Sequence, residues 1–351
     1  LNDDSPIIRA TDSEALVHGS PWSGKTPCYR NESCPIAAVV RLSQAPHNRI
    51  RRLRPIESIG ALLPSAPPAF ARDERLSDDT CGLLSRLIAQ VPVYHLECLP
   101  DAAALEAVSL IENPDTVVLD TSTAHRTAPG WVYGFPELSP AQAEAIRTAK
   151  RIAVPGCHAS GFIALTAPLR AAGILPGGTL LSCFSLTGYS GGGKKMIAEY
   201  EMQPSPAKLH APRQYALGQS HKHLPEMAAV SGLPAPVFCP VVGDFYSGMQ
   251  VTVPLFAAQC VPGTTKEQIA ALYRDIYRGP VVRFTEVPDE GGFLSAASLS
   301  GKDSMQISVS GNEDRMLLLA VYDNLGKGAS GAALECLNMI LDTDPCEGLC
   351  L

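Results

Sequence analysis

One short segment constrains the fold most strongly, because residues 151–165 join an apolar strand to an apolar helix and place a cysteine at the junction. Residues 151–154 have strand composition, and Pro155-Gly156 breaks the strand. Residues 162–165 then open an apolar helical run that ends near Gly173, so the cysteine is delivered to the start of a helix. The unpaired N–H groups and positive dipole at a helix start favour a thiolate over a thiol. We therefore expect Cys157 to be a nucleophile; the alternative is a small side chain that only packs at the junction.

Length and composition bound the class of protein. A chain of 351 residues with 46% hydrophobic and 18% charged residues can bury a large core and is typical of two globular domains. Its formal net charge of −7 argues against nucleic acid and anionic membranes as partners. No apolar run reaches the roughly 18 residues of a membrane span and no signal-peptide pattern opens the sequence, so we expect a cytoplasmic protein. Eleven scattered cysteines without metal-ligand spacing favour reduced thiols and no metal site.

A strand–helix–strand pattern precedes the cysteine. Residues 93–98 and 116–120 have strand composition, and Asp101 can cap an amphipathic helix between them, which predicts a βαβ unit. The second strand runs into the polar stretch 120–126. Ligands of open α/β sheets bind at the carboxyl ends of the strands, so this stretch is a candidate ligand site. A further helix is predicted over residues 140–150, with proline at its first position.

A glycine-rich loop follows the next predicted strand, residues 180–186. Residues 187–195 read Thr-Gly-Tyr-Ser-Gly-Gly-Gly-Lys-Lys, and four glycines let backbone N–H groups come close to an anion. A surface turn is the alternative, but the loop leads from a buried strand straight into a predicted helix over residues 194–202. We therefore expect the loop to contact an anion.

Two histidines lie close together, at positions 221 and 223, just before the carboxylate of Glu226. No third ligand has metal-site spacing, so a metal site is the weaker interpretation. Acid–base catalysis beside a thiolate fits better. We favour His223 because it directly precedes the helical turn at residues 224–226, with His221 as the alternative.

The remaining pattern predicts a mixed sheet with helices. Residues 249–255 alternate as an antiparallel strand does, and further strands are predicted at 305–309 and 316–321. Thr264 and Glu267 form a predicted capping box before an amphipathic helix. Glycines around Asn324 would let the backbone approach a planar ligand, unless they only start the helix that follows. That helix presents a predicted apolar face of Leu334, Leu337 and Ile340.

Residues 1–92 are patterned differently from the rest. Their hydrophobic periodicity is poor, and we expect residues 49–55 to form a basic, solvated loop and residues 61–70 an extended, proline-rich linker. Residues 19–26 satisfy the G-x-x-x-x-G-K-[ST] pattern of a phosphate-binding loop. A working loop of this kind needs a buried strand before it and a helix after it, whereas a weak strand precedes it and Pro27 follows directly.

Six motifs from Cys98 to Leu341 resemble the N-acetyl-gamma-glutamyl-phosphate reductase family of arginine biosynthesis, in particular its shorter type. They occur in the family's order: Cys98-Leu99-Pro100-Asp101, Asp120-Thr121-Ser122-Thr123-Ala124-His125-Arg126 with Tyr133-Gly134-Phe135-Pro136-Glu137-Leu138, Pro155-Gly156-Cys157, Thr187-Gly188-Tyr189-Ser190-Gly191-Gly192-Gly193-Lys194, His221-Lys222-His223-Leu224-Pro225-Glu226, and Asp323-Asn324-Leu325-Gly326-Lys327-Gly328. Each motif alone is weak, and the ordered set is specific.

The resemblance implies an α/β fold with a Rossmann-like dinucleotide-binding domain and an α+β catalytic domain built on a mixed sheet, of the semialdehyde-dehydrogenase kind. The implied organisation is an atypical part over residues 1–92, the remainder of the dinucleotide-binding domain over 93–156, a catalytic, substrate and dimerisation domain over 157–328, a helix over 329–341 that packs back on the first domain, and a tail over 342–351.

The resemblance also implies the chemistry. Cys157 would attack the acyl phosphate of N-acetyl-L-glutamyl 5-phosphate and form a thioacyl enzyme, which takes a hydride from NADPH to give the semialdehyde. His223 or His221 would be the acid or base. The implied substrate-binding residues are Ser122, Arg126, Tyr189, Lys194 and Glu226, and the implied cofactor-binding residues are Pro100, Gly188, Gly191, Gly192 and Asn324. The implied partners are a small-molecule substrate and further copies of the chain in a homo-oligomer.

Two departures from the family keep rival functions open. Residues 157–161 read Cys-His-Ala-Ser-Gly where the family usually has Cys-Tyr-Pro-Thr-Gly, and residues 1–92 hold no G-x-G-x-x-G loop for the NADP pyrophosphate. A divergent domain and a mis-framed reading of the gene would both produce such an N-terminal part. The alternatives are an enzyme like aspartate-semialdehyde dehydrogenase, a non-catalytic remnant unable to bind NADP, and, third, a phosphate-loop NTPase.

Overall fold

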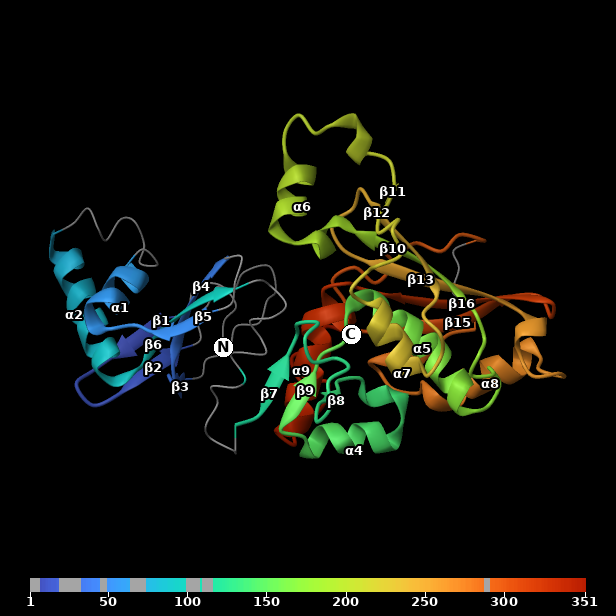
Figure 1. Cartoon of the computed structure of the whole chain (residues 1–351), viewed down its shortest axis with the longest axis horizontal. Helices are drawn as coiled ribbons and strands as arrows, with labels where there is room; N and C mark the ends of the chain where they lie inside the picture. The colour runs from blue at the N-terminus through green and yellow to red at the C-terminus, as the bar shows by residue number, and fades with distance from the viewer. Residues whose placement is uncertain are drawn as a thin grey trace. The chain divides into compact units, whose positions relative to one another are not determined.

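A computed structural model describes residues 7–18, 33–44, 49–63, 74–98, 108, 116–286 and 291–351 of the chain. The chain divides into two compact units, Leu1–Glu112 and Asn113–Leu351 (Figure 1). The division falls after residue 112, whereas the sequence places the first change of character after residue 92. The phosphate-loop pattern at residues 19–26 and Pro100 lie outside the described residues.

The first unit contains two small sheets and two helices. Strands β1 (Ile7–Ala10), β2 (Ala15–His18) and β3 (Ser33–Pro35) form an antiparallel sheet. In the second sheet, β6 (Val93–Cys98) lies between β4 (Val39–Gln44), to which it is parallel, and β5 (Arg49–Arg52), to which it is antiparallel. Helices α1 (Pro55–Leu62) and α2 (Glu74–Gln90) pack against each other, and α2 buries Leu84 and Leu87 against β1 and β2.

Two expectations for this unit were wrong. Residues 49–52, expected in a loop, form the edge strand β5, whose exposed arginines suit an edge because charged side chains discourage further pairing. Residues 61–62, expected in a linker, complete α1, and Ala61 is buried with Leu53 and Val93.

The second unit begins with a small parallel sheet. Its strand order is β7 (Val118–Asp120), β9 (Arg151–Ala153) and β8 (Val132–Tyr133). Helix α4 (Pro140–Thr148) contacts β8, and α9 (Gly331–Ile340) contacts α4 and β7. The expected βαβ unit is therefore not formed as predicted, because β6 pairs with β4 and β5 while β7 pairs with β9.

Helix α9 buries a different face from the one expected. Cys336 and Met339 pack with Ile146 and Ile152, whereas Leu337 is 40% exposed. The buried face also includes Glu335, whose carboxylate is paired with a lysine, so a charged residue occupies a position that the sequence pattern assigns to the surface.

A seven-stranded mixed sheet forms the centre of the second unit (Figure 1). Its strand order is β11 (Arg213–Gln214), β12 (Val237–Gly243), β10 (Ser182–Gly188), β13 (Met249–Phe256), β16 (Arg315–Tyr322), β15 (Met305–Gly311) and β14 (Val282–Phe284). Helix α5 (Cys157–Ala171) lies against β13 and β16, with α7 (Leu224–Ser231) and α8 (Lys266–Ile276) beside it. Phe162, Ile163 and Leu165 of α5 are fully buried in the resulting core.

The capping box of α8 is one residue later than predicted. The Oγ1 atom of Thr265 accepts from the N–H of Gln268 at 3.2 Å, and Gln268 Oε1 accepts from the N–H of Thr265 at 3.0 Å. Both registers satisfy the sequence pattern, and the helix buries Ile269 and Tyr273.

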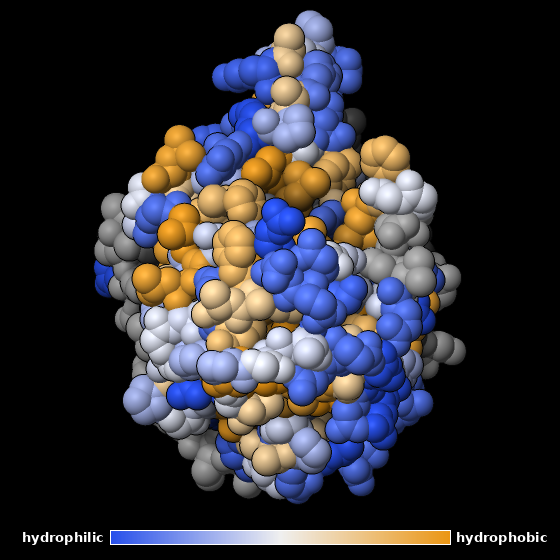
Figure 2. All heavy atoms as spheres, turned by 90° about the vertical axis from the view of Figure 1, so that its right-hand side faces the viewer, coloured by the Kyte–Doolittle hydropathy of each residue, from blue (hydrophilic) through white to orange (hydrophobic). Residues whose placement is uncertain are grey.

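The other face of the large sheet carries exposed apolar side chains. Phe184, Val237, Phe256 and Leu317 are between 41% and 59% exposed, while their neighbours along each strand point into the core. In the view of Figure 2, hydrophobic side chains cluster over the upper and left parts of the surface, with hydrophilic side chains between them and over the lower right. Among the described residues, no helix has both the length and the apolar character needed to cross a membrane.

Candidate active site

Cys157 is the first residue of α5, directly after the turn that ends β9. Gly156 caps the helix, and its N–H donates to Glu226 Oε1 at 2.8 Å. The hydroxyl of Tyr322 donates to the carbonyl of Cys157 at 2.5 Å and accepts from the N–H of Gly161 at 3.1 Å. The first turn of the helix is therefore fixed from both sides, which holds the half-buried thiol in one place.

A pocket of about 310 Å³ surrounds the thiol. It brings together segments that are far apart in the sequence: residues 154–158, 187–193, 221–223 and 324–329. Of the predicted site residues, those lining it are Arg126, Cys157, Gly188, Gly191, Gly192, His221, His223 and Asn324. Ser122, Tyr189, Lys194 and Glu226 do not line it.

The resting thiol is protonated, contrary to the expectation from its helix position. Burial raises the pKa of Cys157 to about 11, and this effect outweighs the N–H of His158 and the charge of Arg126, which both act to lower it. The helix start therefore does not by itself supply a thiolate, and attack requires a base in the pocket.

Both predicted histidines are neutral near pH 7. Burial lowers the pKa of His221 to about 4 and that of His223 well below 6.5. The backbone N–H of His223 donates to His221 Nδ1 at 3.2 Å, so the neutral His221 ring carries its proton on Nε2. A methyl group on Gly156 would lie 2.6 Å from His223 Nε2, which places that atom next to the turn that carries the cysteine.

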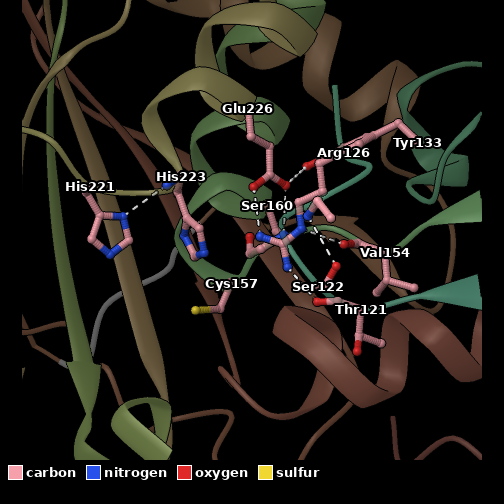
Figure 3. A network of polar contacts seen from close by, with 12 residues as sticks. Thr121, Ser122, Arg126, Tyr133, Val154, Cys157, Ser160, His221, His223 and Glu226 are labelled. Atoms are coloured by element: carbon pink, nitrogen blue, oxygen red, sulfur yellow. Dashed lines mark hydrogen bonds and ion pairs between the residues drawn. The ribbon is translucent and has the colours of Figure 1, made fainter. Parts of the chain in front are cut away.

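Glu226 is not a ligand-facing residue but a buried clamp on the nucleophile's turn (Figure 3). The carboxylate is 2% exposed and accepts from Tyr133 Oη at 2.7 Å, from Gly156 N–H at 2.8 Å and from Arg126 Nη1 at 3.0 Å. It therefore ties α7, which follows His223, to the small parallel sheet and to the start of α5.

Arg126 is held by the protein through three of its donors. Besides Glu226, it donates from Nε to the Val154 carbonyl at 2.9 Å and from Nη2 to the Thr121 carbonyl at 2.9 Å. A guanidinium has five N–H groups, so two have no partner among the described residues and can serve a ligand in the pocket that Arg126 lines.

The other predicted substrate residues shape the surroundings. Ser122 Oγ donates to Asp120 Oδ2 at 2.7 Å and so orders the loop after β7. Tyr189 stacks on Tyr200 with ring centroids 4.6 Å apart, and Lys194 is exposed on helix α6 (Gly193–Glu201).

The glycine-rich loop forms one wall of the pocket. A methyl group on Gly188 would lie 2.5 Å from the Tyr246 carbonyl oxygen, so only glycine fits there. Asn324 Oδ1 accepts from Gly248 N–H at 2.9 Å, and Nδ2 donates to Ser190 Oγ at 3.0 Å. Asn324 therefore fixes the loop against β13, and one of its amide N–H groups has no partner in the part of the chain that the structure describes.

Sequence reasoning missed two features of this site. His158 and Tyr215 form part of the pocket and are hydrogen-bonded to each other. In the sequence, His158 is only a departure from the family's motif, and Tyr215 belongs to no recognised motif. Lys327 is 2% exposed and donates to both oxygens of Glu137, at 2.7 and 2.8 Å, and to Glu335. Its charge fixes the segment that carries Gly328 against Cys157.

Comparisons with known proteins agree with this architecture. The family described as "Semialdehyde dehydrogenase, dimerisation domain" matches residues 157–324. N-acetyl-gamma-glutamyl-phosphate reductase of Sinorhizobium medicae is 44% identical over 252 residues, which cover 70% of this chain and 81% of the relative. The reductase of the same name from Rhizobium etli is 43% identical over 286 residues, which cover 79% of this chain and 89% of the relative.

Solved structures show the same fold. Aspartate semialdehyde dehydrogenase II from Vibrio cholerae has a TM-score of 0.54 at 16% identity and covers 72% of this chain and 84% of that one. The aspartate semialdehyde dehydrogenase from Francisella tularensis has a TM-score of 0.54 at 14% identity, covering 70% and 80%. The predicted fold of the semialdehyde-dehydrogenase kind, with its mixed sheet, is confirmed.

Proposed function

Since the chain belongs to the N-acetyl-gamma-glutamyl-phosphate reductase family, we propose that it reduces N-acetyl-L-glutamyl 5-phosphate to N-acetyl-L-glutamate 5-semialdehyde and phosphate, with NADPH as the reductant. One observation carries the proposal for this chain. A cysteine at a helix start shares a pocket with two neutral histidines and a glycine-rich loop, and this set of groups suits acyl transfer through a thioester.

In the first step, His223 accepts the thiol proton as Cys157 Sγ attacks the acyl carbon. The S–C bond forms, the C–O bond to the phosphate breaks, and phosphate leaves with the electron pair. His223 is the better base because its Nε2 lies beside Gly156 and is not committed to a hydrogen bond in the described residues, whereas Nδ1 of His221 is occupied.

In the second step, the thioacyl group on Cys157 is reduced and the thiol is restored. A nicotinamide cofactor, when bound, would supply the hydride for this reduction. The S–C bond then breaks, the aldehyde leaves, and the proton held by His223 returns to the sulfur. The thiol ends protonated, as its raised pKa requires.

Gly328 packs closely against the nucleophile's residue. A methyl group on Gly328 would lie 3.1 Å from Cys157 Cβ and 3.0 Å from the Asp323 carbonyl oxygen, so glycine is needed for this close approach. Backbone N–H groups of the glycine-rich loop and the two spare donors of Arg126 would hold the phosphate and carboxylate groups of the ligands. Asn324 has one N–H group left for the nicotinamide amide.

We also propose that the chain works as a homo-oligomer, with a second copy covering the apolar face of the large sheet. The match to a dimerisation domain covers the strands that expose Phe184, Val237, Phe256 and Leu317.

Two acyl phosphates test the proposed function. The purified chain should oxidise NADPH with N-acetyl-L-glutamyl 5-phosphate and only weakly with L-aspartyl 4-phosphate, and Cys157→Ser should abolish both. Equal rates with both would instead favour an enzyme like the structural neighbours. A chain that leaves NADPH fluorescence unchanged on titration would be the non-catalytic remnant.

A further inference from the structure

Tyr215 is a pocket residue to which neither the motifs nor the mechanism assigns a role. It follows β11, and its hydroxyl lies 2.6 Å from His158 Nε2. On the other side of the same ring, His158 Nδ1 lies 2.7 Å from Ser185 Oγ on β10. The chain Ser185–His158–Tyr215 therefore runs from the buried sheet to the pocket wall.

The number of hydrogens on these three side chains determines which atom donates in each of the two hydrogen bonds. His158 is 4% exposed and Ser185 is 1% exposed, and burial lowers the pKa of His158 to about 3, so the ring is neutral and carries one proton. If that proton were on Nδ1, it would donate to Ser185, and the buried Ser185 hydroxyl hydrogen would have no other acceptor among the described residues. An unsatisfied buried donor destabilises the folded protein, so this arrangement is disfavoured.

The opposite arrangement satisfies every buried group. Ser185 O–H donates to His158 Nδ1, and His158 Nε2–H donates to Tyr215 Oη. The phenolic hydrogen of Tyr215 is then free. Tyr215 is only partly buried and lines the pocket, so this hydrogen points to where a ligand or water can accept it.

The hydroxyl lies near the nucleophile. Tyr215 and Cys157 line the same pocket, and burial together with the neighbouring Cys157 raises the pKa of Tyr215, so the phenol stays protonated at all working pH values. A neutral donor that lines the same pocket as the sulfur can stabilise charge that develops on a substrate oxygen there.

We propose that Tyr215 is a further catalytic residue that donates its hydroxyl hydrogen to the acyl oxygen of the substrate on Cys157, and that His158 is the positioning residue that frees this hydrogen. The proposal rests on the proposed function and deepens it. When sulfur adds to the acyl carbon, the carbonyl oxygen gains negative charge, and the Tyr215 O–H stabilises it until the carbonyl re-forms and phosphate leaves.

Phosphate release in a single turnover without NADPH measures this step alone. Tyr215→Phe should slow release at least about tenfold, since loss of one oxyanion donor costs roughly 100- to 1,000-fold in the strongest cases. Tyr277→Phe is the matched control, because that hydroxyl donates to the Ala164 carbonyl of α5 and does not line the pocket. Unchanged release from Tyr215→Phe would overturn the proposal.

A double variant tests the role of His158. If His158 acts only through Tyr215, His158→Phe/Tyr215→Phe should be no slower than Tyr215→Phe, with folding checked by circular dichroism. A clearly slower double variant would contradict the positioning role.

Nitrogen NMR of protein labelled with ¹⁵N-histidine shows which ring nitrogen of His158 carries the proton, and this measurement does not depend on enzymatic activity. His158 should carry its proton on Nε2, and the resonance should shift in Tyr215→Phe; a proton on Nδ1 would overturn the proposal. If wild type releases no more phosphate than Cys157→Ser, the proposed function fails, and this measurement still decides the hydrogen-bond direction.

Discussion

At the scale of single residues, the candidate site depends on a thiol that is harder to ionise than its position suggests. A cysteine at a helix start suggests a low pKa, yet the pocket around Cys157 removes water from it. The sequence can place the cysteine at the helix start but cannot show the burial, which comes from segments far away in the chain.

Alkylation of Cys157 should therefore rise with pH over a wide range. Below a pKa of about 11, the thiolate fraction grows about tenfold for each pH unit, so the rate with iodoacetamide should increase without a plateau up to pH 10. Mass spectrometry of the Cys157 peptide measures the alkylation rate of Cys157 separately from that of the other cysteines. A plateau near pH 8 would mean that the thiol is activated at rest.

Glu226 illustrates a second limit of sequence reasoning at this scale. Its place after the histidine pair suggested a ligand contact, whereas both its oxygens accept hydrogen bonds from the protein, donated by Tyr133, Gly156 and Arg126. These partners are 70 to 100 residues away in the chain, so no local pattern reveals them.

Glu226→Gln should be strongly destabilising. It leaves the buried guanidinium of Arg126 without its counter-charge, and breaking a buried pair costs roughly 3–5 kcal/mol of unfolding free energy. Glu286→Gln, which breaks the exposed pair with Arg274, should cost about 1 kcal/mol or less in the same urea titration. Similar losses of unfolding free energy in both variants would contradict the proposal that Glu226 holds the cysteine's turn in place.

At the scale of elements, local patterns predicted most strands and helices of the second unit but not their faces or register. The strand at 151–153 and the helix from Cys157 follow from a clear break in an apolar run. Helix α9 shows where prediction of the buried face from the sequence pattern fails. A polarity pattern assigns Glu335 to the surface, whereas Glu335 is buried and paired with Lys327.

The start of α8 offers a test of register. Thr264 and Thr265 each have an acidic or amide residue three positions later, but only Thr265 accepts the N–H of Gln268. Thr265→Ala should lower the unfolding free energy by about 1 kcal/mol, and Thr264→Ala, its neighbour outside the cap, by less. The reverse order in thermal unfolding would place the cap at Thr264.

At the scale of the whole molecule, the order of motifs identified the family although the first unit lacks the family's glycine-rich pattern. The expected βαβ unit failed because strand pairing is not local: β6 takes its partners from residues 39–52, and β7 takes β9. Strand composition alone cannot choose among such partners.

The apolar face of the large sheet should be an interface between copies of the chain. Leu317→Glu would place a charge on that face and should convert a dimer to a monomer in light scattering after gel filtration. Phe293→Glu, on an exposed residue outside the named strands of the sheet, should leave the mass unchanged. A dimer in both variants would place the interface elsewhere.

The most direct test of the central claim is the mass of the protein after mixing with N-acetyl-L-glutamyl 5-phosphate in the absence of NADPH. The intact mass should rise by one N-acetylglutamyl group, the Cys157 peptide should carry it, and NADPH should remove it. Cys157→Ser should show neither the labile adduct nor turnover. Turnover by Cys157→Ser, or an adduct on another cysteine, would contradict the account.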